Sequence, residues 1–79
     1  MSEADLRRLR WRCRRGMLEN DLVLERFLDR HAATLDAEGL ALLNALLELG
    51  DNELWDVLSG RRECADARLG PMVRMLREA

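Results

Sequence analysis

The sequence is poor in the residues that favour β-strands and in those that interrupt helices. Only 4% of its 79 residues are aromatic, and one is proline. The β-branched residues are few, namely Val23, Thr34, Val57 and Val73. Because β-branched and aromatic side chains dominate strands, this scarcity argues against a β-sheet. Leucine and alanine supply most of the 48% hydrophobic content, so the composition predicts an all-α fold.

The chain is also short of the groups that catalytic and metal sites require. His31 is the sole histidine, Cys13 and Cys64 lie far apart, and no GxGxxG or GxxxxGK loop is present to hold a phosphate. We therefore predict that the chain is not an enzyme and binds no metal or cofactor by itself. His31 is expected to be a hydrogen-bonded histidine in the core or at its boundary. The cysteines are expected to be small buried hydrophobic residues or free thiols, with a disulfide as the alternative.

Long apolar runs are absent as well. None approaches the ~20 residues that a transmembrane helix needs, and the N-terminus lacks the apolar stretch of a signal peptide. We expect a cytoplasmic protein that does not insert into a membrane. A chain of 79 residues is long enough for one hydrophobic core and no more. The prediction is a small single-domain five-helix bundle that covers residues 1–79.

Charge is distributed unevenly along the chain, although the net charge is only -2. Residues 1–16 contain six arginines and two acids, which gives this segment a charge of +4, and the remainder is acidic. A local basic patch of this kind attracts nucleic acid, an anionic membrane or an acidic protein surface. Charge alone does not distinguish these partners.

The first predicted helix runs from about Glu3 to Arg14. Ser2 and Asp5 have the spacing of a capping box at its start. Arginines cover most of its circumference, and its inward face is expected to contain Leu6, Leu9 and Cys13. Gly16 stands where a helix commonly ends in a left-handed C′ residue.

The second helix is predicted to begin between Met17 and Asn20, with acidic residues in its first turn. One broad apolar face recurs along it, formed by Val23, Leu24, Phe27, Leu28 and His31. Leu18 and Leu22 project to the other side. They either pack beneath the first helix or contribute to an exposed binding patch.

The third helix follows a cap at Thr34 or Asp36. It has almost no polar side because of Leu40, Leu42, Leu43, Leu46, Leu47 and Leu49. A helix that is apolar all round is typically buried among others, so we expect it at the centre of the bundle. Gly50 is expected to end it.

Two shorter helices complete the predicted bundle. Asp51 is expected to cap the fourth, which ends at Gly60 and has an inward stripe of Leu54, Trp55 and Leu58. Asp66 is expected to cap the fifth, whose inward face contains Leu69, Met72, Val73 and Leu76. Pro71 removes a backbone donor within this pattern, so the fifth helix is either kinked there or begins properly at Pro71.

One short motif between the first two helices is more specific than these patterns. Arg15-Gly16-Met17-Leu18-Glu19 is an RGxxE pentapeptide within the longer segment WRCRRGMLENDLVLERF. Together with the leucine-rich third helix, DNELWDVLSG and ADARLGPMVRML, it resembles the FAD assembly factor SdhE family, also called succinate dehydrogenase assembly factor 2. The resemblance covers nearly the whole chain, in order and without evident gaps.

The resemblance implies a five-helix bundle that assists covalent attachment of FAD to the flavoprotein subunit of succinate dehydrogenase, and in bacteria of fumarate reductase. FAD would belong to that partner, in which a histidine bonds to the 8α-methyl group of the flavin. The functional motif of the family corresponds to Arg15, Gly16 and Glu19, and the resemblance adds Met17 and Arg8 as partner contacts. We expect a monomer, because the basic face should repel a second copy.

The motif also has a physical interpretation of its own. Gly16 lacks a Cβ, so it can adopt a positive φ and let another protein's backbone approach. The guanidinium of Arg15 offers a fork of donors to a partner, and Glu19 can accept from that partner or orient Arg15. In the alternative interpretation Gly16 is only a helix cap, and Arg15 and Glu19 form a surface ion pair.

A different class of function also fits the basic first helix. Arginines between Arg7 and Arg15 would contact nucleic-acid phosphates, and such binding depends steeply on salt. The acidic remainder of the chain and the lack of a turn and recognition helix argue against it. The favoured prediction is therefore a chaperone-like assembly factor that binds a protein, with a small helical nucleic-acid-binding protein as the alternative.

Overall fold

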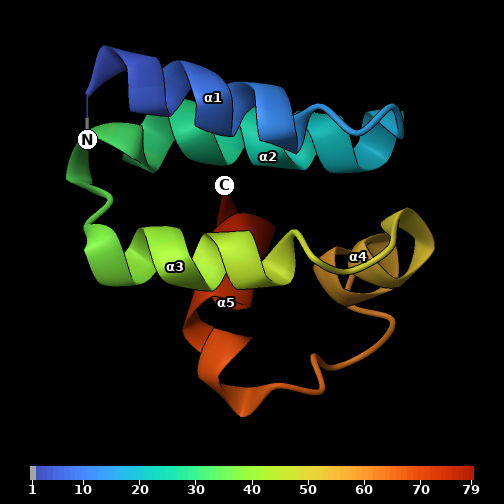
Figure 1. Cartoon of the computed structure of the whole chain (residues 1–79). Coiled ribbons are helices and arrows are strands. Elements are labelled where there is room, and N and C mark those ends of the chain that lie inside the picture. Colours follow the sequence, from blue (N-terminus) through green and yellow to red (C-terminus); the bar gives the residue numbers. More distant parts are fainter. Residues whose placement is uncertain (1) are drawn as a thin grey trace.

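The computed structural model describes residues 2–79 of the chain. Its helices, in order, are α1 (Glu3–Cys13), α2 (Leu18–His31), α3 (Ala37–Leu46), α4 (Asp51–Leu58) and α5 (Gly70–Glu78) (Figure 1). Two short 3-10 turns precede α3 and α5, namely η1 (Ala32–Thr34) and η2 (Ala67–Leu69). The predicted all-α bundle of five helices is confirmed. None of these five helices has the length and apolar character needed to cross a membrane.

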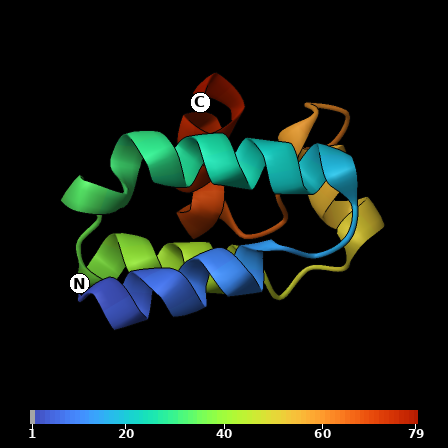
Figure 2. The same ribbon diagram turned by 90° about the horizontal axis from the view of Figure 1, so that it is seen from above.

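The helices α1, α2 and α3 lie roughly along one direction, whereas α5 runs across them (Figure 1, Figure 2). α1 and α2 form an antiparallel pair joined by a short turn. α2 contacts α1, α4 and α5, and buried side chains from all five helices form one hydrophobic core. The pair of α1 and α2 therefore combines a face packed on the core with a face turned to solvent.

The expectation that the third helix lies at the centre of the bundle is wrong. Leu43 and Leu46 are fully buried, but Leu40 and other leucines of this segment are only partly buried. α2 has the more central place, since it packs against three other helices and Phe27 is fully buried. The surface of so small a domain is too large for polar residues alone to cover, so a leucine-rich helix stays partly exposed.

Local sequence signals set several helix ends as predicted. The capping box of α1 is complete, because Ser2 Oγ accepts from the Asp5 amide at 3.1 Å and the Asp5 carboxylate accepts from the Ser2 amide at 3.4 Å. Hydrogen bonds from Ser2 hold the pKa of Asp5 below its ordinary value. Asp36 caps α3 by accepting from the Gly39 amide at 2.7 Å. Gly60 follows α4 with a φ of +87°.

Other helix ends differ from the prediction. α3 ends at Leu46, four residues before Gly50, and the chain then makes a turn. Gly50 is the N-cap of α4, so Asp51 is the first helical residue and not the cap. Asp66 caps the 3-10 turn η2 that leads into α5. Pro71 lies in the first turn of α5, where the missing amide has no partner to lose, so a start at the proline is the alternative observed.

The outward side of α2 carries exposed leucines. Leu18 is 66% exposed and Leu22 is 41% exposed, so neither packs beneath α1. The alternative, an exposed patch, is the arrangement observed. On the inner side His31 lies half-buried at the core boundary, with its ring 5.1 Å from the ring of Phe27. The two cysteines are free thiols, as predicted.

Candidate functional site

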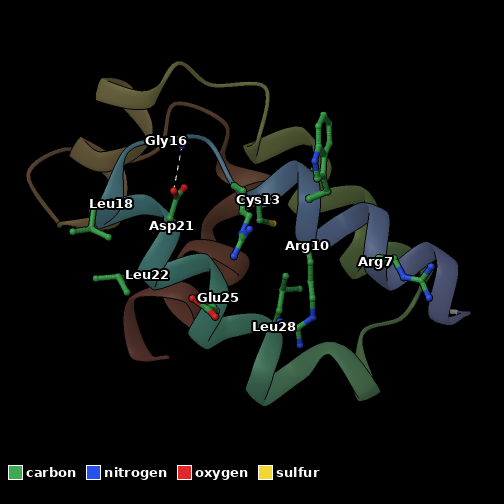
Figure 3. Close-up of a pocket in the computed structure, with 11 residues that line it drawn as sticks. Arg7, Arg10, Cys13, Gly16, Leu18, Asp21, Leu22, Glu25 and Leu28 are labelled. Carbon is green, nitrogen blue, oxygen red and sulfur yellow. Dashed lines mark hydrogen bonds between the residues drawn. The ribbon is translucent and has the colours of Figure 1, made fainter.

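The connection between α1 and α2, residues 14–17, is termed the Gly16 turn. One oxygen of the Asp21 carboxylate accepts a hydrogen bond from the Gly16 amide at 3.2 Å (Figure 3). The other accepts from the Arg15 amide at 2.8 Å. Asp21 lies in the first turn of α2, where free backbone amides favour negative charge. The Asp21 carboxylate therefore binds the backbone of the turn and also places a favourable negative charge at the start of α2. The sequence predicted the acidic first turn but not these bonds to the preceding residues.

Gly16 determines the direction of the turn. Its φ is +95°, and Arg14 is the C-cap of α1, so Gly16 lies two positions beyond the cap and not at the predicted C′. Apart from its two chain neighbours, no atom of residues 2–79 lies within 4 Å of a Cβ added to Gly16, and the residue is exposed. A side chain here is therefore disfavoured by the backbone conformation and not by crowding. The space in front of Gly16 is open to another molecule.

Arg15 points into the molecule, with only 17% of its side chain exposed. Its Nε donates to Asp51 Oδ1 at 2.6 Å, and its Nη1 and Nη2 donate to the carbonyl oxygens of Leu47 and Leu49. These carbonyls follow α3, where main-chain acceptors lack partners within the helix. All three nitrogens of the guanidinium are thus engaged within the chain. From the sequence we expected the Arg15 guanidinium to donate to a partner or, in the alternative, to form a surface ion pair with Glu19. In the structure it binds Leu47, Leu49 and Asp51 instead.

Asn20 binds the same segment from the other side of the turn. Its side chain is fully buried, and its Nδ2 donates to the Asp51 carbonyl oxygen at 3.0 Å and to the Met17 sulfur at 3.4 Å. The Asn20 Oδ1 is buried without a hydrogen-bond partner among residues 2–79. Asparagine is seldom buried, although the spacing of Asn20 from Leu24 and Phe27 places it on the apolar face of α2.

The residues predicted to contact a partner fall into three groups in space. Arg15 is internal, and Arg8 lies on α1 with 80% of its side chain exposed. Exposed Gly16 and half-buried Met17 lie in the Gly16 turn, next to exposed Glu19 in the first turn of α2. Arg8 lines a second hollow on α1, of about 660 Å³, and does not line the groove between α1 and α2. The structure therefore brings together Gly16, Met17 and Glu19, but not all five predicted residues.

A groove of about 640 Å³ lies between α1 and α2 beside the Gly16 turn (Figure 3). Large apolar side chains in its lining are open to water: Trp11 is 77% exposed, and Leu18 and Leu22 also belong to it. Its charged lining comprises Arg7, Arg10, Arg14, Asp21 and Glu25. Exposed apolar residues gathered in this way mark an interaction surface. We term Trp11, Gly16, Leu18, Glu19 and Leu22 together the α1–α2 edge.

Trp11 was not identified from the sequence as a site residue. The available signal was its register, because it falls between the inward positions Leu9 and Cys13 on α1. A tryptophan at an outward position of a soluble helix is unusual enough to indicate a contact with another molecule.

The basic character of α1 is reduced by contacts within the chain. Arg10 donates to Asp29 at 3.1 Å, and Arg12 lies 3.8 Å from the Glu48 carboxylate. Arg15 is bound internally. Arginines paired in this way contribute less to a nucleic-acid interface, which needs cations free to neutralise phosphates.

The groove offers no activated nucleophile. Burial raises the pKa of the Cys13 thiol to about 11, and the reactive species of cysteine is the thiolate. Within residues 2–79 no group of three or more His, Cys, Asp or Glu residues is placed to hold a metal ion. The site supplies shape, apolar surface and charge, which are the properties of a binding surface.

Comparison with known proteins identifies the family. The family Sdh5, described as flavinator of succinate dehydrogenase, matches residues 7–79. The chain belongs to this family. It is 48% identical over 67 residues to the FAD assembly factor SdhE of Ralstonia nicotianae, covering 85% of this chain and 70% of that protein. No solved structure matches the chain significantly.

Two further members of the family align over longer stretches. The FAD assembly factor SdhE of Pseudomonas aeruginosa is 43% identical over 74 residues, which are 94% of this chain and 88% of that protein. The protein of the same name from Shewanella oneidensis is 39% identical over 77 residues, or 98% and 94% of the two chains. The family inferred from the RGxxE motif is therefore confirmed, and the matched range includes the Gly16 turn, the groove and Asp51.

Proposed function

We propose that this member of the flavinator family promotes the covalent attachment of FAD to the flavoprotein subunit of succinate dehydrogenase, and that it does so by docking through the α1–α2 edge. The observation that carries the proposal is the bare Gly16 turn beside the exposed Trp11, Leu18 and Leu22. FAD belongs to the partner, and this chain binds no cofactor. The flavoprotein of a bacterial fumarate reductase is a second client.

Each part of the edge has a distinct physical task in this proposal. Burial of Trp11 and the two leucines stabilises the complex by about 25 cal/mol for each Å² of apolar surface removed from water. Gly16 lets the partner's backbone come close, and Glu19 accepts hydrogen bonds from it. Half-buried Met17 adapts its shape to the partner, and exposed Arg8 adds a contact with an acidic group.

The proposed mechanism is conformational. The bond between a histidine of the flavoprotein and the 8α-methyl group of FAD forms within the partner, and the edge contributes by binding. An assembly factor favours that reaction when it binds the reactive conformation of the partner more tightly than the others. A preference of about 1.4 kcal/mol raises the relative population of that conformation tenfold.

The test is to co-express the flavoprotein subunit with the wild-type chain or with Gly16→Arg and to measure protein-bound flavin fluorescence after denaturation. The matched control is Gly60→Arg, because Gly60 also has a positive φ, +87°, and open space around its missing Cβ. We expect covalent flavin to fall to the level without assembly factor for Gly16→Arg only. Equal covalent flavin with all three chains would reject the proposal.

A further inference from the structure

Arg15 begins the RGxxE motif, yet its guanidinium is turned away from the α1–α2 edge and bound within the chain. We propose that Arg15 is a positioning residue: together with Asp51 it fixes the Gly16 turn against the segment between α3 and α4, and so sets the shape of the edge. The proposal rests on the proposed function, in which the edge contacts the flavoprotein. It gives Arg15 no contact with the partner, and it adds Asp51 to the residues on which docking depends.

The geometry of Arg15 is that of a clamp on one short segment. Its three donor nitrogens reach Leu47, Leu49 and Asp51, which are 32, 34 and 36 residues away in sequence. Hydrogen bonds from a guanidinium to a carboxylate are about twice as strong as those between neutral groups. A lysine keeps the charge but cannot make three bonds in this fork, so the clamp is specific for arginine.

Asn20 provides the second tether, from the opposite end of the turn. Its Nδ2 donates to the backbone carbonyl oxygen of Asp51, while the Arg15 Nε donates to the carboxylate of the same residue. The Gly16 turn is therefore bracketed, since the residues on both sides of Gly16 bind Asp51. Burying an asparagine whose Oδ1 has no partner within residues 2–79 costs folding free energy. If this position served only to fill the core, an apolar side chain would be more stable there. The bond from Asn20 to the Asp51 carbonyl oxygen agrees with a positioning role for Asn20.

A glycine turn needs such tethers because glycine has the largest backbone freedom of any residue. Apart from the clamp, the turn is held by the Asp21 carboxylate. Without Arg15 or Asp51, the turn would sample several shapes, and docking would have to order it again at a cost in affinity. The consequence is a loss of affinity that exceeds what the loss of global stability explains.

The experiment compares Arg15→Lys and Asp51→Ala with the control Arg77→Ala. Arg77 makes a similar clamp between α5 and α4, outside the groove lining, donating from Nε at 3.0 Å and Nη2 at 2.7 Å to the Val57 carbonyl oxygen. The first readout is hydrogen exchange of the Arg15 and Gly16 amides in the free protein. The second is the Kd for the flavoprotein subunit, at a temperature where circular dichroism shows each variant folded. Asp51→Asn replaces Asp51→Ala if the latter does not fold.

We expect hydrogen exchange of the Arg15 and Gly16 amides to become about tenfold faster or more in both Arg15→Lys and Asp51→Ala. A segment that loses the contacts holding it opens more often, and its amides then exchange faster. The Kd should rise by a similar factor. Both changes remove the bond between Arg15 and Asp51, so the effects of the two substitutions should not add, and the double variant should bind about as weakly as Arg15→Lys alone. Arg77→Ala should leave exchange at the turn and the Kd as in the wild type.

Two results would overturn the clamp. If Asp51→Ala binds as the wild type does while Arg15→Lys does not, then Arg15 touches the partner directly. If hydrogen exchange of the turn amides is unchanged in both variants, then Arg15 does not hold the conformation of the Gly16 turn, and this conclusion does not depend on the measured Kd. Accelerated exchange together with no flavoprotein binding by the wild type would support the clamp and reject the proposed function instead.

Discussion

The Asp21 carboxylate accepts the backbone amide of Gly16 at 3.2 Å, so a side chain in the first turn of α2 closes the turn that precedes the helix. The same carboxylate accepts the Arg15 amide at 2.8 Å. Gly16, which meets the partner in the proposed function, and the adjacent Arg15 are thus held by an acid that itself lines the groove. This arrangement makes the order of the Gly16 turn depend on a residue outside the RGxxE motif.

Asp21→Ala should lower the free energy of unfolding by about 1–2 kcal/mol, because two amides lose their acceptor and the first turn of α2 loses a favourable charge. Urea denaturation followed by circular dichroism measures this. Glu25→Ala is the control, since Glu25 is an exposed acid one turn later on α2, and its effect should stay within about 0.5 kcal/mol. Equal effects of the two substitutions would show that the bonds to the turn add nothing to stability.

Gly16→Ala and Gly60→Ala should destabilise the fold to a similar degree, because both positions have a positive φ and both have open space for a Cβ. The expected loss is about 1 kcal/mol each. For a domain of this size that lowers Tm by about 4–8 °C in a calorimetric scan. Only Gly16→Ala should also reduce covalent flavin on a co-expressed flavoprotein. A reduction of the same size with Gly60→Ala would assign the effect to stability and not to docking.

The sequence predicted what depends on local chemistry. The capping box of Ser2 and Asp5, the positive φ of Gly16 and the inward face of α2 follow from spacing of a few residues, and the structure confirms them. The family could be recognised because the RGxxE motif and the segments that follow it occur in order along the chain.

The sequence did not predict what depends on contacts between distant segments. The partners of Arg15 lie 32 to 36 residues away, and no spacing rule connects them. The burial of Asn20 depends on the same segment, which reaches it only after α3 and α4 are packed. The predicted central place of α3 was wrong for a related reason. A run of leucines shows that a helix is apolar, but it does not show how many other helices pack against it.

Trp11→Ala should weaken binding to the flavoprotein subunit without unfolding the chain. The side chain is 77% exposed, so its removal should change the free energy of unfolding by less than about 0.5 kcal/mol. Tryptophans at interface centres contribute about 2 kcal/mol or more, so the Kd should rise by about thirtyfold. Isothermal titration measures the Kd. The control Trp55→Ala alters a half-buried tryptophan that packs against the core, and it should lower stability instead.

Cys13 should make the stability of the fold fall at alkaline pH. Burial raises the pKa of its thiol from 9.0 to about 11, and the nearby Arg12 and Arg15 oppose this effect without cancelling it. The folded state therefore holds the proton more tightly than the unfolded state does. The stabilisation is complete below pH 9 and is lost as the pH rises toward 11, up to a limit of about 3 kcal/mol.

Urea denaturation at pH 8 and at pH 10.5 tests this dependence on Cys13. The wild type should lose stability between the two pH values, whereas Cys13→Ala should lose less, because its unfolded state gains no thiolate at this position. Cys64→Ala is the matched control, since Cys64 is only partly buried and the variant keeps the buried thiol. If all three chains lose the same free energy between the two pH values, the alkaline loss has another origin, and the buried thiol does not couple folding to pH.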